Sequence, residues 1–188
     1  MKYSFVSAIL SISMGGTLME AKEVVSIIQS YRHDLLNDLQ IIQGYVKLGK
    51  MEKVDDNLNK LFAFFHKERK LLNLNIPHVV IWFLEFRMKY NQFKLDYSIR
   101  IDDIKLTDAD LYIKEKLDQI IQDIEQRADD VNVYTIYVDF TENENGCTIN
   151  VSIDLKERSA EDNIPPSEDI YIKQTPEKRI YSFDVFAS

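Results

Sequence analysis

The sequence predicts an α+β protein in which a helical hairpin precedes a small domain of mixed helices and strands. Apolar residues recur with a helical period over the first third of the chain and with a strand period in several later segments. The few glycines and prolines fall between these segments. We therefore expect an N-terminal extension at residues 1–19, a helical hairpin at residues 20–75 and an α/β domain at residues 76–188.

The first long helix is expected between Glu20 and Leu48. Apolar side chains recur there at spacings of four, three, four, four, three and four residues. They are Val24, Ile28, Tyr31, Leu35, Leu39, Ile42 and Val46. Such a stripe is the heptad-like pattern of helices that pack in bundles and coiled coils.

A second helix is expected from Met51 to Leu72, after a break at Gly49. Its apolar stripe consists of Val54, Leu58, Leu61, Phe65 and Leu72. Because the connection is only a few residues long, the two helices should fold back antiparallel. A single hairpin leaves both stripes half covered, whereas pairing with a second copy in a four-helix bundle covers them. The sequence therefore predicts a homodimer.

The rest of the chain alternates between helix and strand patterns. Pro77 suits the first position of a buried helix, HVVIWFLEFRMKY. Residues 93–101 alternate as a half-buried strand, and Thr107 followed by Asp110 resembles the capping box of a further helix. Three more strands are expected, NVYTIYVDF, CTINVSIDL and RIYSFDVF, with the turn TENENG joining the first two. This order of elements predicts a layered α/β domain.

The composition excludes several classes of partner. A formal net charge of −8 and a pI near 4.9 disfavour nucleic acid and anionic membrane surfaces. The apolar run near the N-terminus is too short to span a bilayer, so a cytoplasmic protein is expected. A single cysteine excludes an intramolecular disulfide, and with three histidines it forms no zinc-site pattern. We expect no metal or cofactor held by the chain itself.

His33 lies within the first helix, in the stretch SYRHDLLNDLQIIQGY. At 100° per residue it points about 160° away from Leu35, and therefore toward solvent. The same outer face carries Asn37, Gln40 and Gly44, an uncharged polar track that ends in a residue without a side chain. Such a track allows another protein to approach the helix closely.

An exposed histidine on a rigid helix, with no pocket of its own, suits phosphoryl transfer between proteins. Neutral imidazole attacks a phosphoryl group and holds it as a phosphoramidate. Because the transfer depends mainly on positioning and electrostatics, a visiting domain can bring the metal and the acidic pocket. Arg32 or a nearby lysine would then offset phosphate charge, and Asp34 would orient the ring or draw its proton; neither role is fixed by the sequence. A merely solvated surface histidine is the commoner case, and periodicity alone does not exclude it.

The residues around His33 also resemble a known motif. The string Arg32-His33-Asp34-Leu35-Leu36-Asn37 resembles the R-H-[DE]-x-x-N phosphoacceptor box of one branch of two-component signalling proteins. The continuation DLQIIQGYVKLGK and the later LLNLNIPHVVIWFLEF are similar to the sporulation initiation phosphotransferase family of the Bacillus-type phosphorelay. The resemblance extends over residues 24 to 90, and beyond them only in the order of elements.

The resemblance implies that His33 is the phosphoacceptor, with Arg32, Asp34 and Asn37 beside it in a docking surface. It implies a dimeric four-helix bundle and a C-terminal domain like a degenerate histidine-kinase ATPase domain. It also implies phosphotransfer from the aspartyl phosphate of a single-domain response regulator to the aspartate of a sporulation response-regulator transcription factor. Any Mg²⁺ is then expected in the acidic pocket of the partner.

Two alternatives stay open beside this interpretation. A sensor histidine kinase needs an asparagine-bearing helix box, where this chain has Gln119 and Asp123. It also needs glycine-rich turns near the nucleotide, but Leu155-Lys156-Glu157-Arg158 follow the strand instead, and no glycine occurs after Gly146. We therefore expect no tight ATP binding. The other alternative is a dimeric adaptor that binds response regulators without chemistry.

Overall fold

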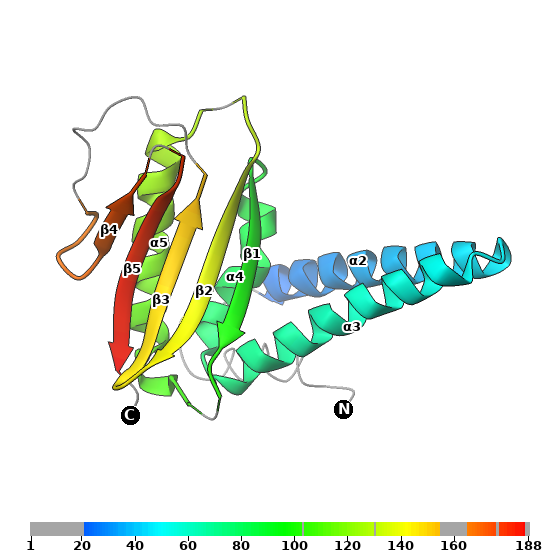
Figure 1. Ribbon diagram of the computed structural model, residues 1–188, viewed down its shortest axis with the longest axis horizontal. Helices are drawn as coiled ribbons and strands as arrows, with labels where there is room; N and C mark the ends of the chain where they lie inside the picture. The colour runs from blue at the N-terminus through cyan, green and yellow to red at the C-terminus, as the bar shows by residue number, and fades with distance from the viewer. Residues whose placement is uncertain (1–20, 103, 130, 155–164, 176, 187–188) are drawn as a thin grey trace. The chain divides into compact units, whose positions relative to one another are not determined.

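The computed structural model describes residues 21–102, 104–129, 131–154, 165–175 and 177–186. The chain divides into two compact units, Met1–Leu72 and Asn73–Ser188 (Figure 1). Two long helices form the first, and a sheet with helices forms the second, so the predicted α+β class is confirmed. The expected extension at residues 1–19 lies outside the described residues. No described helix has both the length and the apolar character needed to cross a membrane.

The first unit is an antiparallel hairpin of α2 (Ala21–Lys47) and α3 (Met51–Asn73). The end of α2 is a Schellman motif, in which Gly49 N–H donates to the Val46 carbonyl and Lys50 N–H to the Tyr45 carbonyl, each at 3.0 Å. Gly49 has φ +67°, a left-handed conformation that glycine adopts without strain. The helix therefore ends at the glycine that the sequence indicated.

The apolar stripes of the two helices are only partly buried within the chain. Half-buried stripe residues are Val24, Ile28, Tyr31, Leu35 and Ile42 on α2, and Leu58, Leu61, Phe65 and Leu72 on α3. Val54 is buried, whereas Leu39 and Val46 are 46% and 51% exposed. Apolar surface therefore remains open to solvent along the hairpin.

One charged residue lies on the α3 stripe. Glu68 comes three residues after Phe65 and four before Leu72, at a core position of the heptad pattern. Its side chain is buried, and its Oε2 accepts a hydrogen bond from the Tyr31 hydroxyl of α2 at 3.2 Å. The stripe expected from the sequence omitted this position, because glutamate is seldom buried without a partner.

The second unit is a five-stranded mixed sheet in the order β1-β2-β3-β5-β4, with both α4 (Pro77–Lys89) and α5 (Asp110–Arg127) on one face (Figure 1). The strands are β1 (Phe93–Arg100), β2 (Tyr134–Asn143), β3 (Gly146–Ile153), β4 (Tyr171–Gln174) and β5 (Arg179–Phe186). β1 and β2 are parallel and the other pairs antiparallel. The parallel pair requires a crossover, which α5 supplies between the two strands.

The core of this unit lies on one face of the sheet. Alternate residues of the central strands point to this face, as the strand period requires. The buried set consists of Ile136, Val138 and Phe140 on β2, Ile149, Val151 and Ile153 on β3, and Tyr181, Phe183 and Val185 on β5. The buried residues of α5 include Ile113, Leu117, Ile120, Ile121 and Ile124. Each such aliphatic side chain stabilises the fold by about 1.5–3 kcal/mol through burial.

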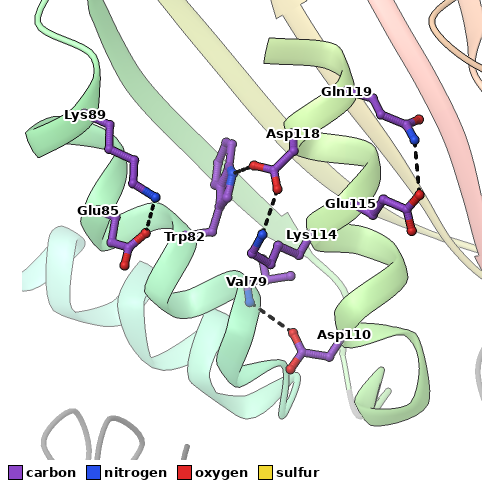
Figure 2. A network of polar contacts seen from close by, with 9 residues as sticks. All are labelled: Val79, Trp82, Glu85, Lys89, Asp110, Lys114, Glu115, Asp118 and Gln119. Carbon is purple, nitrogen blue, oxygen red and sulfur yellow. Dashed lines mark hydrogen bonds and ion pairs between the residues drawn. The ribbon is translucent and has the colours of Figure 1, made fainter. Parts of the chain in front are cut away.

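Asp110 joins two helices instead of capping its own. Its carboxylate accepts hydrogen bonds from the backbone N–H groups of His78 at 2.9 Å and Val79 at 3.0 Å, at the start of α4. Figure 2 shows the bond from Val79. The predicted capping box is wrong, because Thr107 begins a short 3-10 helix and its hydroxyl oxygen accepts a bond from Asn75. The first N–H groups of α4 have no intrahelical partner, so the carboxylate of Asp110 satisfies them.

The strand pattern differs from expectation in two places. β2 continues to Asn143, which pairs with Gly146, so the β2–β3 turn is shorter than the predicted TENENG. The four-residue β4 was not expected, and it pairs with β5 at the edge of the sheet. The expected strands at residues 93–101 and RIYSFDVF are confirmed as β1 and β5.

Candidate functional site

His33 is presented to solvent on a regular helix. Its side chain is 73% exposed, as the helical periodicity predicted. From residue 21 to the glycine at position 44, α2 contains no helix-breaking residue. The imidazole therefore projects from a continuous α-helix and is accessible to a partner.

Both polar contacts of the imidazole are made at Nδ1. The Asn37 side-chain nitrogen Nδ2 lies 3.2 Å from it, and a carboxylate oxygen of Asp34 lies 3.5 Å from it. Asn37 reaches the ring because residues four apart are neighbours on a helix surface. Among the described residues, no polar group contacts Nε2 of this histidine.

This arrangement distinguishes the two ring nitrogens. In neutral imidazole one nitrogen carries the proton and the other carries a lone pair. The Asn37 Nδ2 amide can donate only to an unprotonated Nδ1. When the proton is on Nδ1, the carboxylate of Asp34 is the acceptor that stabilises it. The lone pair is then on Nε2, the nitrogen with no polar contact to the described part of the chain.

Gln40 and Gly44 continue the same face of α2, as expected from the sequence. Arg32 and Gln40 are exposed, and neither contacts the imidazole within the described residues. A Cβ atom added at Gly44 would meet no atom within 4 Å. Packing among the described residues therefore gives no reason for glycine at this helical position.

Two exposed apolar residues that were not predicted from the sequence flank the docking surface. Leu36 and Ile41 lie about 60° and about 80° from His33 around the helix, on opposite sides of the polar track. They are 52% and 49% exposed. Exposed apolar side chains beside a polar strip are typical of protein interfaces. Their position outside the heptad stripe is the sequence signal that identifies them.

The two α5 positions considered for a nucleotide site are Gln119 and Asp123. Their side chains form hydrogen bonds with other side chains of the protein. The Gln119 amide donates to Glu115 at 3.2 Å (Figure 2). Asp123 accepts two bonds from Arg127, at 2.9 and 3.0 Å, and one from the Tyr181 hydroxyl at 2.5 Å. Burial first, and then the contact with Asp123, raise the pKa of Tyr181, so its hydroxyl stays protonated. Residues 155–158 lie outside the described residues.

Solved histidine kinases match the chain at low overall similarity. Acinetobacter baumannii histidine kinase AdeS matches 82% of this chain and 97% of its own, with 12% identity and a TM-score of 0.44. Histidine kinase ThkA, solved in complex with response regulator protein TrrA, matches 89% of this chain and 64% of its own, with 14% identity and a TM-score of 0.40.

Sequence comparison gives a more specific result for the helical part. Sporulation initiation phosphotransferase B of Bacillus subtilis (strain 168) is 32% identical over 91 residues, which are 47% of this chain and 47% of that protein. The match thus spans about half the length of that relative. Residues 14–74 match the family described as Sensor_kinase_SpoOB-type, alpha-helical domain. The resemblance that the sequence predicted is therefore confirmed, and the helical part of the chain is similar to the SpoOB-type domain of sensor kinases.

Proposed function

We propose that the chain is a phosphotransferase that carries a phosphoryl group on His33 between response-regulator receiver domains. The observation that supports this most directly is an exposed imidazole whose Nδ1 lies beside the polar side chains of Asp34 and Asn37, while Nε2 has no polar contact within the described residues. The similarity of residues 14–74 to the SpoOB-type domain supports the same conclusion. The donor is a single-domain response regulator and the acceptor a sporulation response-regulator transcription factor.

In the proposed reaction Nε2 is the nucleophile. Its lone pair attacks phosphorus, the bond from phosphorus to the aspartyl oxygen breaks, and the aspartate of the donor leaves as a carboxylate. The imidazole gains positive charge as the N–P bond forms, and Asp34 beside Nδ1 stabilises it. Attack by the aspartate of the acceptor then reverses these steps. The receiver's acidic pocket supplies Mg²⁺, and this chain needs no cofactor of its own.

Arg32, Asn37, Gln40 and Gly44 belong to the docking surface in this proposal. Gly44 matters because a helical glycine costs about 0.5–1 kcal/mol relative to alanine, and no neighbour in the described part of the chain requires it. Close approach of a partner to the helix backbone accounts for a glycine at this position. The exposed Leu36 provides apolar contact at the edge of the same surface.

Gly44→Ala should therefore stabilise the protein and weaken docking together. We expect the free energy of unfolding to rise by about 0.5–1 kcal/mol. Affinity for the receiver domain, measured by calorimetry, should fall several-fold because a methyl group enters the interface. Gln43→Ala, at an exposed neighbouring position, is the control. Unchanged affinity in Gly44→Ala would remove this residue from the docking surface.

The proposed protein is a homodimer in which two hairpins form a four-helix bundle. The exposed Leu39 and Val46 support this, because they lie on the heptad stripe and remain uncovered in one chain. Leu39→Asp should convert dimers to monomers in light scattering at micromolar concentration. Ile41→Asp, with similar exposure on the other side of α2, should leave the dimer intact. A monomeric wild type would contradict the proposal.

The test of the function is transfer without nucleotide. The protein is mixed with a receiver domain already phosphorylated on aspartate, in the absence of ATP. We expect an acid-labile, base-stable label on His33. If a receiver that demonstrably binds leaves no label, the adaptor alternative replaces this proposal.

A further inference from the structure

The hairpin contains a carboxyl group at a position that its pattern reserves for apolar residues. On α3 the core positions 54, 58, 61, 65, 68 and 72 follow one another at spacings of four, three, four, three and four. Glu68 is the acidic residue in this series. A glutamate placed there is costly unless it is protonated or paired, because ionised groups are poorly tolerated out of water.

Glu68 has a specific contact with the other helix of the hairpin. The residue is 9% exposed, and Oε2 accepts the hydrogen bond of the Tyr31 hydroxyl at 3.2 Å. Tyr31 belongs to the apolar stripe of α2 and lies two residues before His33. The bond therefore joins α2 to α3 within one turn of the proposed phosphoacceptor.

The neighbours of Glu68 along its own helix are apolar. One turn before it are Phe64 and Phe65, and one turn after it are Leu71 and Leu72. On α2, the residue one turn before Tyr31 is Ile27, which is buried. The carboxyl group thus lies in an apolar layer that favours its neutral form.

The charged residues closest in sequence point elsewhere. Lys67 and Arg69 are rotated by about 100° from Glu68 around α3, and Lys70 by about 160°. On α2, Arg32 and Asp34 are exposed, and Asp34 contacts His33. Burial raises the pKa of Glu68 to about 7, and the hydrogen bond from Tyr31 opposes this rise. The phenol of Tyr31 is thus the titratable group that acts on this carboxyl.

We propose that Glu68 carries a proton inside the hairpin. As the pH rises, loss of this proton loosens the contact between α2 and α3 near His33, and phosphotransfer slows. The regulatory consequence rests on the proposed function of His33. The proton passes from the carboxyl to solvent, and the carboxylate left behind must attract water or shift out of the apolar layer. Either response disturbs the apolar packing of α2 against α3 around Glu68, although the Tyr31 hydroxyl can still donate to the carboxylate.

The sign of the effect follows from linkage. The pKa of Glu68 is higher in the folded protein, about 7, than its ordinary value of 4.5. A group of this kind contributes stability that is complete below the ordinary value and is lost as the pH rises through about 7. The hairpin should therefore be least stable on the alkaline side of neutrality, the opposite of a salt-bridged glutamate.

Thermal unfolding of the full chain, measured between about pH 6 and about pH 8, tests the effect of Glu68 protonation on stability independently of phosphotransfer. We expect the wild-type midpoint to fall across this range and the midpoint of Glu68→Gln to stay nearly constant, because the amide cannot ionise. Glu52→Gln, at an exposed position in the first turn of α3, should behave as wild type. An equal decline in wild type and Glu68→Gln would overturn the proposal.

Two further measurements keep the test decisive. The Glu68 carboxyl carbon, observed by NMR in the wild type, should titrate near neutral pH, and titration near the ordinary value of 4.5 would refute the proposal even if Glu68→Gln does not fold. Tyr31→Phe removes the bond that lowers the pKa, so the titration should move to higher pH. Phosphotransfer by the wild type should decline several-fold over the same range. Failure of His33 labelling would leave the unfolding and NMR results intact.

Discussion

His33→Gln is expected to abolish phosphotransfer while leaving the fold and receiver binding in place. An amide nitrogen has no available lone pair, so the substitution removes the nucleophile, and the transfer rate should fall by at least about a thousandfold. Because the side chain is 73% exposed, the free energy of unfolding should change by no more than about 0.5 kcal/mol. Labelling by a phosphorylated receiver domain measures the rate, and calorimetry measures binding.

A matched control exists on the second helix. His66 is also exposed, but it lies on α3 away from the R-H-D-x-x-N box. His66→Gln should transfer at the wild-type rate. Full transfer by His33→Gln would show that another residue accepts the phosphoryl group, and loss of both transfer and binding would show that the substitution acts on docking.

Asp110→Ala is expected to have the largest effect on stability, about 2–4 kcal/mol. The carboxylate accepts from two backbone N–H groups at the start of α4, and that of Val79 is fully buried. Without the carboxylate these donors stay buried and unsatisfied, and His78 loses its contact at 2.8 Å. Denaturant unfolding monitored by circular dichroism measures the change in free energy.

Two variants separate this explanation from a general effect of charge. Asp108→Ala, at an exposed position two residues earlier, should cost less than about 0.5 kcal/mol. Asp110→Asn keeps one acceptor oxygen and should fall between wild type and Asp110→Ala. If Asp110→Ala were as mild as Asp108→Ala, the contact with α4 would contribute little to stability.

The elements that the sequence predicted well are those whose pattern is local. The hairpin follows from heptad stripes and from Gly49, whose positive φ ends α2 where the stripe stops. Pro77 begins α4 because its fixed φ and missing N–H suit a first helical turn. The exposure of His33 needs only the rotation per residue of an α-helix.

The features that the sequence did not predict depend on contacts between distant residues. Asp110 binds the start of α4 instead of its own helix, and no spacing rule relates it to Val79. β4 is too short to show a period, and its pairing with β5 defines it. Glu68 has the spacing of a stripe residue, but glutamate is seldom buried without a partner, and its partner Tyr31 lies on the other helix. The Asn37–His33 contact, at a spacing of four, was within reach of the sequence.

The parallel pairing of β1 with β2 has a consequence for the order of folding. Phe93 meets Tyr134 only after the whole of α5 has been bridged, so the sheet requires closure of a long loop before its hydrogen bonds contribute. The helices α2 and α3 each form through backbone hydrogen bonds between residues four apart in sequence. Chains rich in local contacts fold faster than those with distant pairings. Refolding should therefore show early helix formation, with completion of the sheet as the slow phase.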